Sequence, residues 1–184
     1  MKATRNHFLR LLLALFILLF SLPLQAQEKP APCPSLSVYF SPKGGCTEAI
    51  IKEVDNAKIS VLVQAYNFSS APIAKALLNA HKRGVRVEVI LDKGQRTLKY
   101  SSAKFFFNSG IPTRIDSIRG KNHNKIMIID AETVITGSFN FTKAAEEQNA
   151  ENVLVIRDRK LASLYTEDWE MRAKHSEVYA GKAR

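Results

Sequence analysis

The residues best suited to chemistry form two short clusters in the second half of the chain. His123 and Lys125 are separated by one residue, and Ser138 and Asn140 repeat that spacing. Side chains two positions apart in a strand point to the same face, so each pair can present its groups together. An imidazole, an ammonium, a hydroxyl and an amide suit the oxygens of a phosphodiester. We therefore expect Lys125 and Asn140 to donate to the phosphate while His123 attacks phosphorus.

Three further residues are expected to support this group. Asp130 falls on the opposite strand face from His123 and Lys125 by parity, so we interpret it as structural and not as a proton carrier. Gly137 allows a close backbone approach beside the second cluster. A histidine that acts as a nucleophile needs its other ring nitrogen held by a carboxylate, and Glu151, which opens the strand-like stretch ENVLVI, is the candidate.

The spacing HxKxxxxD followed by GSxN resembles the signature of the phospholipase D superfamily. The likeness is strongest to the small, single-motif, exported bacterial endonucleases of that superfamily, and it extends over YxFSSAPIAKALLNAHKRGV, SGIPTRIDS and GSFNFTKAAEEQNAENVLVI. The resemblance implies a phospholipase D-like fold and hydrolysis through a covalent phosphohistidine intermediate. It also supports Glu151, because small family members carry a glutamate at the start of the strand after GSxN. Glu146 and Glu147 are alternatives by proximity, although a solvated helix surface suits them better.

The chain carries a single copy of this signature, whereas the resemblance implies a second histidine that protonates the leaving oxygen. His81 and His175 lack the HxK context, and surface positions on helices explain them. We therefore predict a homodimer that brings two copies of His123 to one phosphate. No cofactor is expected, and no metal, because a two-metal route needs clustered carboxylates that the sequence does not group.

The formal net charge of +10 favours a polyanionic partner. We expect DNA, with RNA as an open alternative, contacted by basic residues that surround the signature: Arg114, Arg119, Lys121 and Lys143. Two other functions stay open. A cardiolipin-type phospholipid phosphodiesterase would use the same site, but the loop at residues 117–121 is too polar to enter lipid and no exposed hydrophobic loop is evident. A non-catalytic DNA-binding or uptake protein would have no need of a nucleophile.

The N-terminus differs from the rest of the chain. Lys2, Arg5 and Arg10 precede a short apolar run that ends in small residues, which predicts a signal peptide over residues 1–26. We expect an exported protein, periplasmic or secreted, with membrane contact only if this segment is not cleaved. Residues 27–35 are rich in proline and predict an extended tether. In an oxidising compartment, Cys33 and Cys46 are expected to form a disulfide.

The elements that position these residues follow an alternating pattern over residues 36–184. Strand-like and helix-like stretches alternate over residues 36–91 and again over residues 111–175. This order predicts a single α/β domain in which a mixed β-sheet is sandwiched by helices. The stretch at residues 59–66 is nearly continuous β-former, which is typical of a strand covered on both faces.

Overall fold

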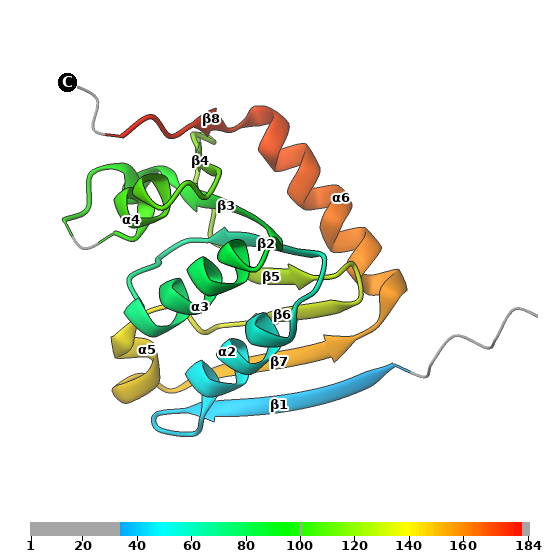
Figure 1. Ribbon diagram of the computed structural model, residues 1–184. Helices are drawn as coiled ribbons and strands as arrows, with labels where there is room; N and C mark the ends of the chain where they lie inside the picture. The colour runs from blue at the N-terminus through cyan, green and yellow to red at the C-terminus, as the bar shows by residue number, and fades with distance from the viewer. Residues whose placement is uncertain (1–33, 100, 182–184) are drawn as a thin grey trace, which may run out of the picture. The chain divides into compact units, whose positions relative to one another are not determined.

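A mixed eight-stranded sheet forms the centre of the molecule in the computed structural model, which describes residues 34–99 and 101–181 (Figure 1). The strands lie in the order β1-β7-β6-β5-β2-β3-β4-β8. Their bounds are β1 Ser35–Ser41, β2 Ser60–Ala65, β3 Arg86–Asp92, β4 Thr113–Asp116, β5 Lys125–Ile129, β6 Thr133–Gly137, β7 Glu151–Arg157 and β8 Glu177–Val178. Strands β2, β3 and β4 are parallel, and the other pairs are antiparallel.

Helices cover both faces of this sheet. They are α2 Cys46–Asn56, α3 Ala71–Lys82, α4 Ala103–Asn108, α5 Lys143–Glu147 and α6 Arg159–His175, with a short 3-10 helix, η1, at Lys93–Arg96. One core cluster joins α2 and α3 to the sheet, and a second joins α6 to the other face. Trp169 fixes α6 in place, because its indole nitrogen donates to the carbonyl of Val63 at 2.9 Å. The predicted fold class is confirmed.

Strand β2 shows why the centre of the sheet is so apolar. All six of its residues are buried, as expected for a strand covered on both faces. Odd-numbered residues from Val61 to Ala65 pack under α2 and α3, and Leu62 packs under α6. The elements η1 and β8 were not foreseen from the sequence.

One edge of the sheet collects the ends of strands that are far apart in the sequence. Ala65 at the end of β2 pairs with Lys125 at the start of β5, and Ser41 at the end of β1 pairs with Glu151 at the start of β7. The parallel strands β3 and β4 end in register at this same edge. Sites in α/β sheets commonly form outside the carboxyl ends of parallel strands.

The N-terminal predictions lie largely outside the described residues. The signal peptide at residues 1–26 and most of the tether at residues 27–35 fall there, although Ser35 already belongs to β1. Within the part of the chain that the structure describes, no helix has the length and apolar character needed to cross a membrane.

The predicted disulfide stays a prediction, because Cys33 lies outside the described residues. Cys46 is fully buried with a free thiol, and burial, with Glu146 nearby, raises its pKa to about 11. It lies beside Ser41, at the carboxyl end of β1.

Candidate active site

His123 lies in the segment that leads into β5, at the end of the sheet where β2 and β3 finish and β5 begins. Its side chain is exposed, whereas Lys125, the first residue of β5, is only 7% exposed. Both side chains therefore start from the edge of the sheet, as the one-residue spacing predicted. His123 itself precedes the strand, and loop contacts rather than strand geometry fix its position.

The ammonium of Lys125 contacts His123 directly. Its Nζ lies 3.0 Å from Nδ1 of the imidazole and also donates to the backbone oxygen of His123. Because an ammonium only donates, Nδ1 acts as the acceptor in this arrangement. Burial lowers the pKa of Lys125, and the carboxylate of Glu151 opposes this shift. The site thus holds a desolvated cation beside its candidate nucleophile.

Tyr66, which the sequence analysis missed, packs against the same imidazole. The two ring centroids are 4.6 Å apart with the planes tilted by 49°. The ammonium groups of Lys121 and Lys125 lie 5.4 and 5.2 Å from the centre of the Tyr66 ring, and Lys121 also donates to its hydroxyl at 3.2 Å. Tyr66 immediately follows β2, so its place after a buried parallel strand was the available signal.

A buried polar bridge holds the His123 loop against the sheet. The backbone N–H of Asn122 donates to Asp92 Oδ2 at 2.8 Å, and the side chain of Gln64 donates to Asn122 Oδ1 at 2.9 Å. These three residues are at most 4% exposed. On the other side of His123, the carbonyl of Asn124 accepts from the backbone of Tyr66 at 2.9 Å. The sequence offered no local pattern for these contacts.

The second cluster follows β6 at the same edge. A Cβ at Gly137 would lie 2.2 Å from the backbone oxygen of Asn152, so only glycine fits there, and its φ of 146° also favours glycine. The hydroxyl oxygen of Ser138 accepts from the backbone of Asn152 at 3.1 Å. Asn140 Oδ1 is buried without a hydrogen-bond partner among the described residues.

The two glutamates considered as partners of His123, Glu151 and Glu146, make different contacts. Glu151 accepts a hydrogen bond from Asn149 Nδ2 at 3.1 Å, and Lys125 instead of Glu151 contacts His123 Nδ1. The orienting role of Glu151 stays a prediction. Its rival Glu146 accepts from the backbone N–H groups of Thr47 and Gly45, so it fixes the start of α2 instead.

Asp130 lies at the far end of β5, away from His123. Its two carboxylate oxygens accept hydrogen bonds of 2.7–2.9 Å from the backbone N–H groups of Lys58, Ile59 and Ser60. Its φ of 54° places it in a turn between β5 and β6. These contacts tie two strands together and are those of a structural residue.

The basic residues expected to contact substrate fall in different places. Arg119 and Lys121 are exposed on the loop that leads to His123, and Lys93 holds this loop by donating to the carbonyls of Ile118 and Arg119. Lys143 is exposed at the start of α5, and its Nζ lies 3.6 Å from Oε1 of Glu147. Arg114 was placed wrongly. It pairs in register with Ile90, which packs under α6, and it donates to the carbonyl of Ser176, so it lies on the other face of the sheet.

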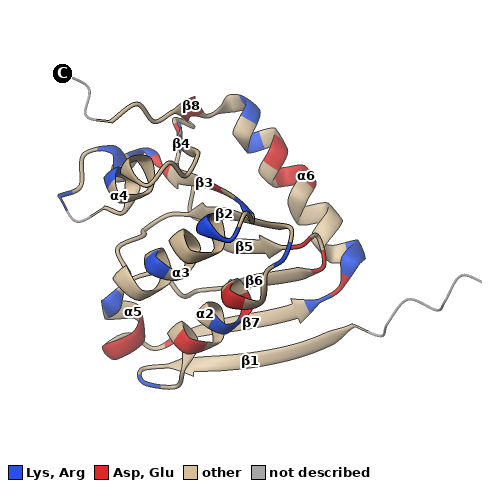
Figure 2. Ribbon diagram, viewed as in Figure 1, with Lys and Arg blue, Asp and Glu red and all other residues tan. Residues whose placement is uncertain are grey.

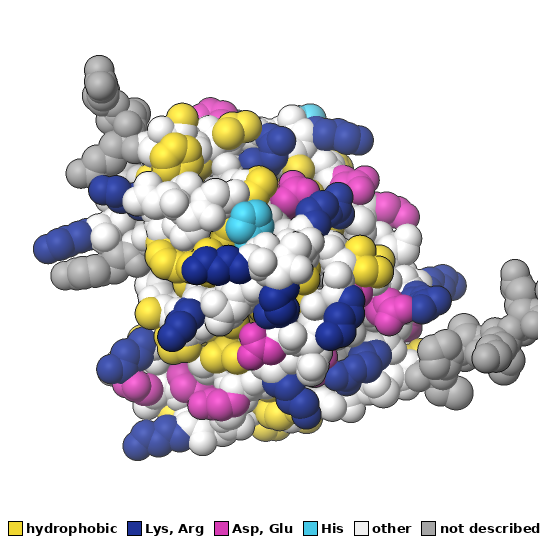
Figure 3. Space-filling model, viewed as in Figure 1, with side chains coloured by type: hydrophobic (Ala, Val, Ile, Leu, Met, Phe, Trp, Pro, Cys, Tyr) yellow, Lys and Arg dark blue, Asp and Glu magenta, His cyan; other side chains and the backbone are white. Residues whose placement is uncertain are grey.

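Across the described residues, no group of three or more His, Cys, Asp or Glu side chains could hold a metal ion. The face that carries α2 and α3 shows Lys and Arg side chains spread widely, with acidic side chains between them (Figure 3).

Sequence comparisons place this site in a known family. A family model described as a cardiolipin synthase, PLD-like domain, matches residues 50–172. A phospholipase D of Rickettsia felis is 46% identical over 134 residues, which cover 73% of this chain and 67% of that protein. A mitochondrial cardiolipin hydrolase of Mus musculus is 37% identical over 114 residues, which cover 62% of this chain and 52% of that one.

Solved structures agree with this assignment. Nuc from Salmonella typhimurium, a phospholipase D family member, superposes with a TM-score of 0.77 at 41% identity, covering 82% of this chain and 99% of that one. NucT from Helicobacter pylori superposes with a TM-score of 0.74 at 21% identity, covering 79% of this chain and 99% of that one, and this likeness supports the fold alone. The chain therefore belongs to the phospholipase D superfamily and is a phosphodiesterase of that superfamily.

Proposed function

We propose that this phosphodiesterase is a metal-independent endonuclease with little sequence preference, and that it acts as a homodimer. The observation that carries the proposal is the cationic surround of His123: the ammonium groups of Lys121 and Lys125 lie against Tyr66, whose ring packs on the imidazole. This group sits at an exposed edge, beside a loop that also presents Arg119. Such an arrangement suits a long polyanion whose phosphates must pass close to the nucleophile.

In the proposed reaction, an imidazole nitrogen of His123 attacks phosphorus and forms the P–N bond of a phosphohistidine. The P–O bond to the leaving oxygen breaks, and that oxygen takes a proton from the imidazolium of the second subunit's His123. A water molecule then attacks phosphorus, gives its proton to the same second histidine, and releases His123 as the P–N bond breaks. Lys125 and Asn140 would hold the phosphate oxygens through both steps.

The Lys125–His123 contact suggests how substrate starts this sequence. A phosphate oxygen would be a better acceptor for the ammonium of Lys125 than Nδ1, because it carries a negative charge. Movement of Lys125 onto the phosphate would free Nδ1 of His123. Glu151, which is close enough to Lys125 to affect its pKa, could then orient the ring.

The homodimer follows from the single copy of the signature. One chain supplies one His123, and the reaction needs both a nucleophile and an acid. The likeness to Nuc extends over 99% of that chain, so we propose one phospholipase D-like domain in each subunit. The likeness to Nuc fits the resemblance to endonucleases that the sequence indicates.

A phospholipid is the second candidate substrate, because relatives are named phospholipase D and mitochondrial cardiolipin hydrolase. The structure also corrects one point against it. No exposed hydrophobic loop was expected from the sequence, yet Leu98, Phe105 and Phe107 are 54%, 40% and 44% exposed around α4. The substrate test must therefore include lipid.

The test compares plasmid, single-stranded DNA, RNA and cardiolipin vesicles in the presence of chelator. We expect cleavage of nucleic acid and no release of product from cardiolipin. His123→Asn should abolish the activity, whereas the matched control His175→Asn, exposed at the end of α6, should retain it. Hydrolysis of cardiolipin alone would replace the proposal with the lipid function, and an active His123→Asn chain would refute the mechanism.

A further inference from the structure

A cavity of about 480 Å³ lies beside the candidate active site, between η1, the start of α4 and the residues after β8. Three of its nine lining residues are cationic, namely Arg96, Lys99 and Lys104. None of the described residues that line it is acidic. Figure 2 shows the corresponding concentration of Lys and Arg along the segment between β3 and α4. A cavity of this volume is large enough for a small organic group.

Short contacts connect this cavity to His123. Gln95, in the cavity wall, donates to the side chain of Asn67 at 2.9 Å and accepts from the backbone of Phe68. Asn67 follows Tyr66, whose ring packs on the imidazole of His123. The cavity and the candidate nucleophile are therefore joined through Gln95, Asn67 and Tyr66.

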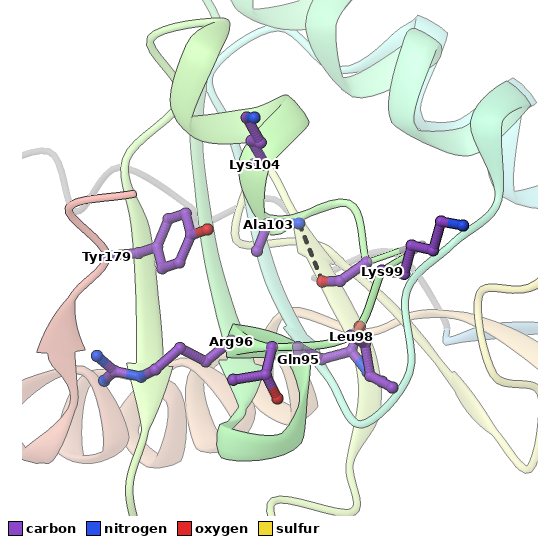
Figure 4. A pocket seen from close by; sticks show the side chains of 9 residues that line it. Gln95, Arg96, Leu98, Lys99, Ala103, Lys104 and Tyr179 are labelled. Atoms are coloured by element: carbon purple, nitrogen blue, oxygen red, sulfur yellow. Dashed lines mark hydrogen bonds between the residues drawn. The ribbon is translucent and has the colours of Figure 1, made fainter. Parts of the chain in front are cut away.

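The interior of the cavity combines apolar and hydrogen-bonding groups. The hydroxyl of Tyr179 points across it toward Ala103, and Leu98 forms part of its wall (Figure 4). The hydroxyl oxygen of Ser101 accepts from the backbone of Ala103 at 3.2 Å, which leaves its own proton free to donate. Small-molecule pockets likewise combine apolar side chains with a few convergent polar groups.

The cations lie around the rim rather than on the floor. Lys99 and Lys104 extend from the rim, and Arg96 reaches toward β8, where it pairs with Glu177 (Figure 4). That ion pair offsets the charge of Arg96, and Lys99 and Lys104 are the other two cationic residues of the lining. Rim ammonium groups are placed to meet phosphates that flank a group inserted in the cavity.

We propose that this cavity binds an unpaired nucleobase of the substrate strand, adjacent to the phosphate that His123 attacks. The base would lie against Leu98 with its polar edge toward Tyr179 and Ser101, while Lys99 and Lys104 contact the flanking phosphates. A base can enter such a cavity only when it is free of its partner strand. The inference rests on the proposed nuclease function and adds to it a preference for single-stranded nucleic acid.

The test measures binding without turnover. In the His123→Asn background, fluorescence anisotropy gives the Kd for a labelled single-stranded oligonucleotide and for the matching duplex. Tyr179→Phe removes one hydroxyl but keeps the ring, which is 4% exposed and packs edge-on to Phe107. This variant and the pair Lys99→Ala with Lys104→Ala should each weaken single-strand binding by about tenfold. Duplex binding should change much less.

A matched pair of lysines controls for lost charge. Lys58 and Lys160 are exposed at the opposite edge of the sheet, before β2 and at the start of α6. Lys58→Ala with Lys160→Ala should leave single-strand affinity unchanged. The cavity would be refuted as a base site by either of two results. One is a loss of single-strand affinity in this control equal to that of the Lys99→Ala, Lys104→Ala pair; the other is a cavity variant that loses affinity equally for duplex and single strand.

The same variants distinguish the cavity from the nuclease function. If the His123→Asn chain binds nucleic acid but the cavity variants bind equally well, the base site fails and the nuclease proposal stands. If the chain binds neither form of DNA, both fail. Loss of binding to cardiolipin vesicles with unchanged single-strand affinity would assign Lys99, Lys104 and the exposed Leu98 to a membrane surface and refute the base site.

Discussion

The buried carboxylate of Asp92 accepts a hydrogen bond of 2.8 Å from the backbone N–H of Asn122, the residue next to His123. Its other oxygen accepts from the backbone of Gly94 at 2.8 Å. Asp92 thus joins the end of β3 to the loop of the candidate nucleophile. Because the donor is the backbone N–H of Asn122, the contact depends on the Asp92 carboxylate and not on the side chain of residue 122. Asp92 is a positioning residue for His123.

Asp92→Ala should therefore lower kcat by about ten- to a hundredfold with a smaller change in KM, because a displaced nucleophile still leaves the phosphate-binding groups in place. Asp92→Asn keeps one oxygen for the Asn122 N–H and should recover part of the loss. Steady-state kinetics on one DNA substrate, corrected for the folded fraction, measures the effect. An unchanged kcat for Asp92→Ala would show that the loop holds His123 without it.

Asp130 provides the comparison for a purely structural carboxylate. Asp130→Ala removes the acceptor for three backbone N–H groups, at Lys58, Ile59 and Ser60, and places alanine at a φ of 54°. We expect a loss of about 2–3 kcal/mol in the free energy of unfolding, measured by urea denaturation. Asp130→Asn should lose less, because asparagine tolerates positive φ and keeps one oxygen. The kcat of the folded fraction should be unchanged in both variants, and a large fall would contradict the structural role.

The sequence predicted the identity of the site better than its construction. The HxK and GSxN spacings pointed to His123, Lys125, Ser138 and Asn140, and the structure brings both clusters to one edge of the sheet because β5 starts and β6 ends there. Parity predicted that Asp130 lies on the opposite strand face from His123, whereas the structure separates the two residues by the length of β5 and places Asp130 in the turn after it. These successes depend on local rules, namely strand alternation and chain order.

Contacts between distant segments could not be predicted in this way. Asp92, Gln64 and Tyr66 meet the His123 loop only because β2 and β3 end beside the start of β5. Arg114 was misplaced for a different reason. Its strand is four residues long, and alternation with the buried Ile115 puts Arg114 on the α6 face. Arg114 is close to the signature in sequence, but the alternation of side chains along β4 points it away from the site.

Lys125 combines a functional role with a cost to stability. The side chain is 7% exposed, and burial lowers the pKa of its ammonium. Lys125→Met keeps the length of the side chain without the charge, so we expect it to abolish activity and to raise the free energy of unfolding at neutral pH by about 1 kcal/mol. Lys121→Met, on the exposed loop, should give no such gain. A destabilised Lys125→Met chain would show that the ammonium contacts outweigh its desolvation.

The pH dependence of this difference has a definite sign. The pKa of Lys125 is lower in the folded chain than in the unfolded chain, so the unfolded chain binds more protons between the two values. The stability of the wild type must therefore rise with pH through that alkaline window, relative to Lys125→Met. Urea denaturation of both proteins from neutral to alkaline pH should show the advantage of Lys125→Met shrinking as the pH rises.

A mixing experiment tests whether two chains share one site. Wild-type and His123→Asn chains are unfolded together and refolded, so that subunits combine at random. If each active site needs His123 from both subunits, only pure wild-type dimers are active, and an equal mixture should keep about a quarter of the activity of the same total amount of wild type. Independent sites would instead keep about half.

The full titration follows the square of the wild-type fraction in the first case and a straight line in the second. Size-exclusion chromatography of His123→Asn, which we expect to elute as a dimer, separates loss of chemistry from loss of assembly. A linear titration with intact dimers would mean that the leaving oxygen takes its proton from a group within the same chain.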